Sequence, residues 1–158
     1  MIYFIGMDDT DNAESRGTGH LARQVAACLS NEFKVIGVVR HQLFFDPRVP
    51  YTKNNSSATI IIEAENGTDL EAVFRYVKGC MLADFQLGSD PGLCVAAGVP
   101  EEVTLFGRRT QKELVTQEEA RQLASKHGIL LEGLGGTEGG VIGALASVGL
   151  SASGEDGR

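Results

Sequence analysis

The stretch "IYFIGMDDTDNAESRGTGHLARQVAACL", residues 2–29, joins an apolar run, an acidic and glycine-rich connection and an amphipathic segment. The apolar run 2–7 is short and stops at carboxylates, which predicts a buried strand that ends at a functional loop. From Thr18 to Leu29 apolar residues recur at helical spacing, with polar residues on the other face. The chain therefore opens as a strand, a loop and a helix.

The rest of the chain alternates strand and helix patterns. Residues 33–45 and 58–65 are rich in β-branched and aromatic side chains, as strands are, and a polar loop lies between them. Residues 129–150 repeat the opening layout with a strand, a glycine-rich loop and a helix of small residues. We expect an α/β (α+β) fold with a mixed sheet covered by helices.

Three further helices are predicted by their terminal residues. Capping boxes at Thr68–Glu71 and Thr116–Glu119 start two of them, which end at Gly79 and Gly128. Pro100 starts the third, through "EEVTLFGRR".

The bulk composition narrows the class of protein. The 158 residues suit one compact domain, expected over 1–150, with a small polar tail at 151–158 that we expect to be disordered. A formal charge of -7 disfavours unassisted binding of nucleic acid. The three separated cysteines predict reduced, buried thiols without a zinc site. Without a secretory leader or a membrane span in the sequence, a cytoplasmic location is predicted.

Asp8, Asp9 and Asp11 follow the first strand within a few residues of one another. Like charges this close raise one another's pKa, so a cation is needed to stabilise them. Carboxylate oxygens suit Mg²⁺, which takes one or two of them and completes its shell with water and phosphate. Asp9 with Asp11, or Asp8 with Asp11, is the expected ligand pair. The alternative is that these residues only form a turn and cap a helix.

Glycines beside Thr18 favour a bound anion. Gly17 and Gly19 allow close approach of the backbone, and the start of a helix offers free amides and a favourable dipole. Thr18 is equally explained as a helix cap.

Two other segments are candidates for phosphate contact. The turn "GLGGTEGG" supplies Gly135, Gly136, Gly139 and Gly140 before the last helix, where tight helix packing is the alternative explanation. In "YTKNN", Lys53 and Asn54 could face the phosphates of a nucleotide or simply belong to a solvated loop.

Several motifs together resemble one family. "IGMDDTDNAESRGTGHLA" resembles the "GIDDTDS…G…T…LA" signature of the archaeal tRNA-isoleucine agmatidine synthetases (TiaS). "FFDPRVPYTKNNSSA" and "GGVIGALASVG" are similar to the family segments "LNPNIPWKTRGNGA" and "RGLIGALAAIG", and "SDPGLCV" to its "DPG" loop. These matches follow the family's order along the whole ordered chain.

The resemblance implies an ATP-dependent kinase-like domain in which Asp8, Asp9 and Asp11 bind Mg²⁺ and the nucleotide phosphates. It also implies that Thr18 is phosphorylated by the domain itself. A kinase-like module joined to a ferredoxin-like portion at roughly 60–130 is implied for the fold. Two lobes, 1–60 with 129–150 and 61–128, are therefore the alternative to a single unit.

We interpret the chain as a Mg²⁺-dependent, ATP-binding phosphotransferase or ATPase, with Lys53 neutralising developing charge and an unknown phosphoryl acceptor. The acidic charge, an altered "WKTRGNGA" segment and the lack of the family's OB-type and zinc-ribbon sequence disfavour direct tRNA binding. A non-catalytic nucleotide-binding subunit with an RNA-binding partner, or an aspartate-based phosphohydrolase, are the alternatives. Assembly with copies of itself or a partner subunit is left open.

Overall fold

The structure is a computed structural model that describes residues 2–8, 18–42, 56–65, 68–83, 92–111, 115–133 and 140–153. In chain order its elements are β1 (Ile2–Asp8), α1 (Thr18–Leu29), β2 (Lys34–Gln42), β3 (Ser56–Glu63), α2 (Leu70–Ala83), β4 (Gly92–Ala96), α3 (Glu101–Thr110), α4 (Gln117–Lys126), β5 (Leu130–Gly133) and α5 (Gly140–Ser153).

The strands form one sheet in the order β2-β3-β1-β4-β5. Every pairing among the described strands is antiparallel, so the α/β class is confirmed but the expectation of a mixed sheet is wrong. The first six elements follow the β-α-β-β-α-β order of a ferredoxin-like motif. That motif spans residues 2–96 and not the 60–130 expected, because it begins with β1 and ends with β4.

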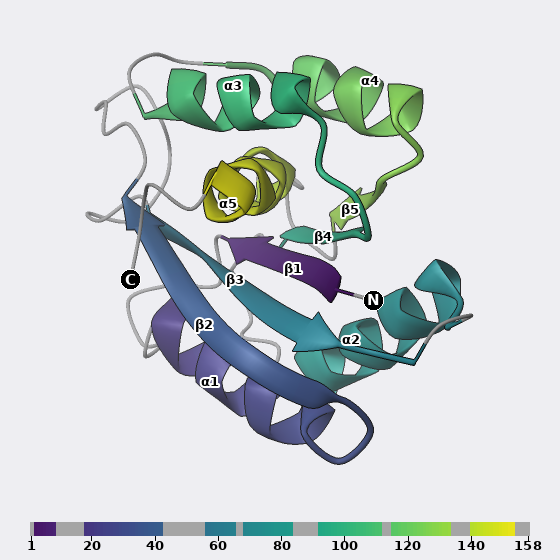
Figure 1. The fold of residues 1–158 in the computed structure, drawn as a ribbon. Coiled ribbons are helices and arrows are strands. Elements are labelled where there is room, and N and C mark those ends of the chain that lie inside the picture. The colour runs from purple at the N-terminus through teal and green to yellow at the C-terminus, as the bar shows by residue number, and fades with distance from the viewer. Residues whose placement is uncertain are drawn as a thin grey trace.

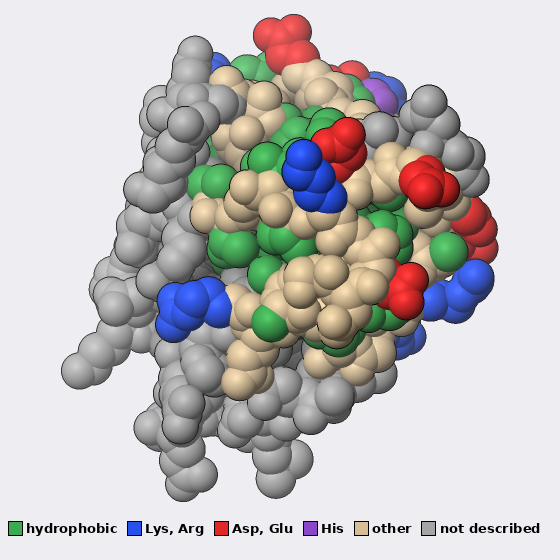
Figure 2. Space-filling model, turned by 60° about the horizontal axis from the view of Figure 1, so that its bottom comes forward, with side chains coloured by type: hydrophobic (Ala, Val, Ile, Leu, Met, Phe, Trp, Pro, Cys, Tyr) green, Lys and Arg blue, Asp and Glu red, His purple; other side chains and the backbone are tan. Residues whose placement is uncertain are grey.

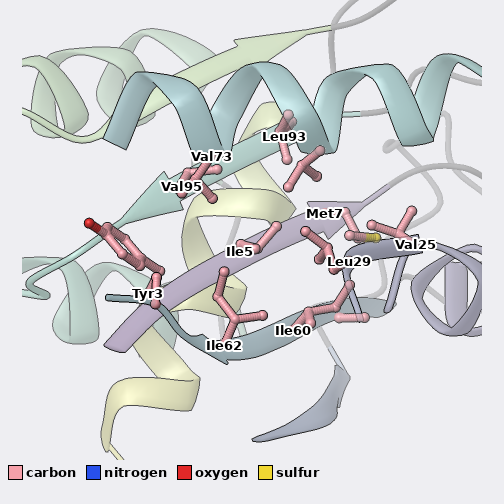
Figure 3. Close-up of a cluster of buried hydrophobic side chains, with 13 residues drawn as sticks. Tyr3, Ile5, Met7, Val25, Leu29, Ile60, Ile62, Val73, Leu93 and Val95 are labelled. Carbon is pink, nitrogen blue, oxygen red and sulfur yellow. The ribbon is translucent and has the colours of Figure 1, made fainter. Parts of the chain in front are cut away.

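Helices cover both faces of the sheet (Figure 1). α1 and α2 lie on one face, α5 crosses the other, and α3 and α4 pack over α5. Alternation along β1 explains this arrangement, since Tyr3, Ile5 and Met7 are buried in the core beneath α1 and α2, as Figure 3 shows. The single sheet contains strands from both of the predicted lobes, 1–60 with 129–150 and 61–128. The extent of the domain, 1–150, remains a prediction.

Small residues let α5 lie directly on β1 and α3. A Cβ built on Gly6 would meet the backbone oxygen of Ala144 at 2.1 Å, and one built on Gly149 would meet the Val103 oxygen at 2.2 Å. Such distances leave no room for a side chain. α5 also continues through Ser153, so residues 151–153, which we expected in the disordered tail, are helical.

The ends of the helices test the predicted caps. The capping box at Thr116 is present, and Gly128 adopts a φ of 68° after α4, as predicted. The box at Thr68 is wrong, because the Oδ1 atom of Asp69 accepts from the Glu71 amide and α2 begins at Leu70. α2 also continues beyond Gly79 to Ala83, since a glycine inside a helix weakens it without ending it.

Two of the three cysteines are bonded, which corrects the expectation of reduced thiols. Cys28 on α1 and Cys80 on α2 form a disulfide, with Cα atoms 6.5 Å apart. The sequence separation of 52 residues concealed this pairing, which exists because the two helices pack side by side on the sheet. Cys94 is a free, buried thiol, as expected.

A buried hydroxyl pair joins the sheet to α5. Thr59 on β3 and Ser147 on α5 are fully buried and hydrogen-bonded to each other. We expect Thr59→Val to lower the free energy of unfolding by about 1–2 kcal/mol, because the Ser147 hydroxyl loses its partner. The double variant Thr59→Val/Ser147→Ala should cost less than the sum of the single changes, measured by urea unfolding of all four proteins. Additive effects would contradict a coupled pair.

β2 is an edge strand with an irregular register. Its pairing to β3 shifts between Val35 and Gly37, which makes Ile36 the extra residue of a β-bulge. Ile36 is 50% exposed.

In the part of the chain that the structure describes, no helix has the length and apolar character needed to cross a membrane.

Candidate functional site

Strand register places five residues in one row across one end of the sheet. Asp8 of β1 pairs with Ser57 on one side and Gly92 on the other. Ser57 pairs in turn with His41 of β2, and Gly92 pairs with Gly133 of β5. At about 4.8 Å per strand the row is ~19 Å wide.

Four connecting segments leave or enter the sheet at this row. Residues 9–17 follow β1, residues 43–55 link β2 to β3, residues 84–91 lead into β4, and residues 134–139 follow β5. Three of these segments contain the residues predicted for metal and phosphate. The fold therefore attaches segments from distant parts of the sequence to one end of the sheet.

Most of the predicted site residues lie outside the described residues, and only their points of attachment are known. Those within the segments are Asp9, Asp11, Gly17, Lys53, Asn54, Gly135, Gly136 and Gly139. Asp8, Thr18, Gly19 and Gly140 are described through their backbone.

Two helices begin toward this end. α1 starts at Thr18, as predicted, and finishes near Lys34, which belongs to the opposite end of the sheet. Gly19 lies within the first turn of α1 and not in a separate turn. α5 begins at Gly140, one turn before Ala144, whose backbone oxygen contacts Gly6 close to Asp8. Helix starts present free amide groups and a favourable dipole to an anion.

A carboxylate residue, Asp8, lies in this row, and the residues that follow it on one side, Gly92 and Gly133, have no side chains. Carboxylate oxygens are ligands that a hard cation prefers. Among the described residues no three His, Cys, Asp or Glu side chains gather to hold a metal ion. Asp9 and Asp11, the other two predicted ligands, belong to the segment 9–17.

Sequence reasoning missed the closeness of Ser57 and Gly92 to Asp8. Gly92 belongs to "SDPGLCV", which we noted only as a turn and a family loop, and Ser57 lies beside the "YTKNN" segment. The β-branched residues of "SSATIII" indicate a strand, but not which strand is its neighbour.

A groove of about 370 Å³ lies between α3 and α4, apart from the sheet end. Its apolar lining is Leu105, Phe106 and Leu123. At its rim Lys126 donates to Glu102 at 3.1 Å, and this contact lowers the pKa of Glu102. Among the site residues whose backbone the structure describes, Asp8, Thr18, Gly19 and Gly140 do not line the groove.

Figure 2 shows one face of the molecule, on which Lys and Arg side chains of the described residues stand at several separate places and acidic side chains lie beside some of them.

The comparisons with known proteins agree with the sequence motifs. No protein-family model matches the chain. The tRNA(Ile2) 2-agmatinylcytidine synthetase TiaS of Pyrococcus horikoshii is 31% identical over 156 residues, which cover 94% of this chain and 36% of that protein. The chain is homologous to part of TiaS. It spans about a third to a half of the length of the curated relatives that it matches.

Solved structures of TiaS have the same fold. The structure of TiaS with tRNA(Ile2) and ATP matches 94% of this chain with a TM-score of 0.80 at 24% identity, and 36% of TiaS is covered. The complex of TiaS with tRNA(Ile2), AMPCPP and agmatine gives a TM-score of 0.77 at 23% identity over the same shares. These likenesses show the fold, and the resemblance to TiaS drawn from the sequence motifs is confirmed.

Proposed function

We propose that this chain binds ATP at the end of the sheet marked by Asp8 and acts in a Mg²⁺-dependent phosphoryl transfer related to tRNA modification. The observation that carries the proposal is the attachment of the acidic, "YTKNN" and glycine-rich segments at one row of strand residues. Nothing in the linear sequence requires these three segments to meet.

The relatives support the ligand class. TiaS has been solved with tRNA(Ile2) and ATP, and with AMPCPP and agmatine, and this chain is homologous to about 36% of TiaS. ATP use by the present chain is inferred from that homology together with the arrangement of its own segments.

Each predicted residue has a role at this end. Asp8, Asp9 and Asp11 would hold Mg²⁺, which when bound neutralises charge on the phosphates. Lys53 and Asn54 would contact phosphate oxygens, and Thr18 would be either a phosphoryl acceptor or part of the helix start. Backbone amides of the two glycine-rich turns would complete the phosphate contacts through Gly17, Gly19, Gly135, Gly136, Gly139 and Gly140.

We expect Asp8→Asn to weaken binding of Mg·ATP at least about ten-fold, because a neutral amide replaces a charged ligand of the metal. Isothermal titration calorimetry with ATP, in the presence of Mg²⁺ and after its removal, measures this effect. Glu118→Gln on α4 is the matched control, since it removes one exposed carboxylate far from the sheet end and should leave the affinity unchanged.

Two results would reject the proposal: wild-type protein that does not bind ATP with Mg²⁺, or an Asp8→Asn variant with unchanged affinity. Intact mass after incubation with Mg·ATP tests the finer prediction for Thr18. A gain of one phosphate that is lost in Thr18→Val identifies Thr18 as the acceptor.

The second function that we propose is a nucleotide-binding subunit that acts with an RNA-binding partner. The match covers 36% of TiaS, so recognition of tRNA by the whole of TiaS is not assigned to this chain. ATP binding without turnover, and turnover restored by such a partner, would favour this function. We propose that contact with tRNA depends on this partner. A cytoplasmic location and assembly of the chain with copies of itself remain predictions.

A further inference from the structure

We propose that Cys28 and Cys80 are a reversible thiol–disulfide couple that controls the order of α1 and, through it, the candidate nucleotide site. The bond connects the last turn of α1 to α2. Its effect on nucleotide binding rests on the proposed function, whereas its effect on α1 does not.

Partial exposure of both cysteines is the feature that would let a small reductant reach the bond. Cys28 and Cys80 are both partly exposed, and Ala27 and Gly79, which precede them in the two helices, are exposed. A disulfide on a helix surface can be attacked by a thiolate from solvent, whereas one sealed in a core cannot.

The third cysteine is isolated from this couple. Cys94 is fully buried on β4, in the core between the sheet and α5, while the couple lies on the opposite face. Burial raises the pKa of the Cys94 thiol, so very little thiolate is present to exchange with the disulfide. Reduction and reoxidation can therefore proceed between two defined partners.

Noncovalent contacts also join the end of α1 to α2. The Tyr76 hydroxyl donates to the Cys28 carbonyl at 3.0 Å, and the Tyr76 ring meets Phe33 edge-on at a centroid distance of 5.9 Å. Val25 and Leu29 bury the other side of α1 in the core. After reduction, α1 would keep these contacts but lose its covalent connection to α2.

The position of α1 links the couple to the candidate site. α1 begins with Thr18 at the functional end of the sheet and carries Cys28 in its last turn. A helix that frays or shifts at one end can also change the position of its other end. Among the described side chains of α1, Val25 and Leu29 anchor the helix in the apolar core, and Ala26 packs against that core partly buried. An ordered Thr18 and free amides around it are what an anion would need.

A dithiol supplies the electrons and protons that reduction of the Cys28–Cys80 bond requires. One thiolate of the dithiol attacks a sulfur of the couple, the S–S bond breaks, and a mixed disulfide forms. The second thiol of the dithiol then displaces the remaining cysteine, so two electrons and two protons pass to Cys28 and Cys80 while the dithiol becomes a disulfide.

Hydrogen exchange of the wild-type chain, oxidised and after reduction with dithiothreitol, tests the effect on α1. We expect amides of 18–29 to exchange at least about ten-fold faster after reduction, while amides of 140–153 in α5 stay within about two-fold. Reoxidation should restore the slow rate, and Cys28→Ser/Cys80→Ser should behave as the reduced protein. Cys94→Ala is the control that keeps its response to dithiothreitol.

Unchanged exchange in 18–29, or an equal increase in α5, would overturn the proposal, because the bond would then be inert or merely hold the whole fold together. Calorimetry on the same samples should give at least about three-fold weaker binding of Mg·ATP after reduction. If neither redox form binds ATP, the proposed function fails, and hydrogen exchange alone decides whether the couple controls α1.

Discussion

Replacing Gly6 by alanine is expected to lower the free energy of unfolding by about 3 kcal/mol. The new methyl group would lie 2.1 Å from the Ala144 backbone oxygen and 2.8 Å from a methyl group of Val148. A backbone oxygen cannot rotate away as a side chain can, so α5 must move off β1 or β1 must bend. Either movement opens the buried interface between the sheet and α5.

The comparison is Gly79→Ala on α2, where a Cβ would meet nothing within 4 Å. Alanine should raise the stability there by about 0.5–1 kcal/mol, since glycine inside a helix is less favourable. Urea unfolding followed by circular dichroism gives both values. A Gly6→Ala protein as stable as the wild type would show that α5 does not lie against β1 as described.

Leu145→Ala is expected to cost about 3–4 kcal/mol. Leu145 is fully buried on α5, within the apolar cluster that α5 forms with α3, α4 and β4. Close packing on several sides prevents the neighbours from collapsing into the cavity that truncation leaves. The matched control is Leu105→Ala on α3, where the side chain is 48% exposed and the loss should stay below about 1 kcal/mol.

The Leu145→Ala variant also tests the prediction that residues 1–150 form one domain. If residues 1–150 unfold as one unit, Leu145→Ala shifts a single transition that near-ultraviolet and far-ultraviolet circular dichroism report together. Two separated transitions, of which only one shifts, would favour two lobes. Equal losses for the two leucine variants would contradict the assigned burial of Leu145.

The sequence predicted the elements of the fold better than their arrangement. Apolar periodicity located the helix at Thr18–Leu29, and the cap at Thr116 was correct because both depend on neighbouring residues. Pairing of β1 with β3 and β4 joins residues that are 49 to 92 positions apart, which no local pattern encodes. The disulfide escaped detection for the same reason.

For the candidate site, too, one part could be predicted from the sequence and another part could not. Chemistry singled out Asp8, Asp9 and Asp11, because three carboxylates cluster directly after an apolar strand. The row that joins Asp8 to Ser57 and Gly92 became visible only through strand register. Register also places Gly92 beside Asp8, which the composition of its sequence neighbourhood does not indicate.

The bulge at Ile36 has a consequence for behaviour at high concentration. β2 is the edge of the sheet, and its Val38 side chain is also partly exposed, so an uninterrupted β2 would offer a long apolar template to the edge of another molecule. The extra residue breaks the regular spacing of amides and carbonyls along that edge. The irregular edge of β2 is therefore a poorer template for the edge strand of another molecule than a regular strand would be.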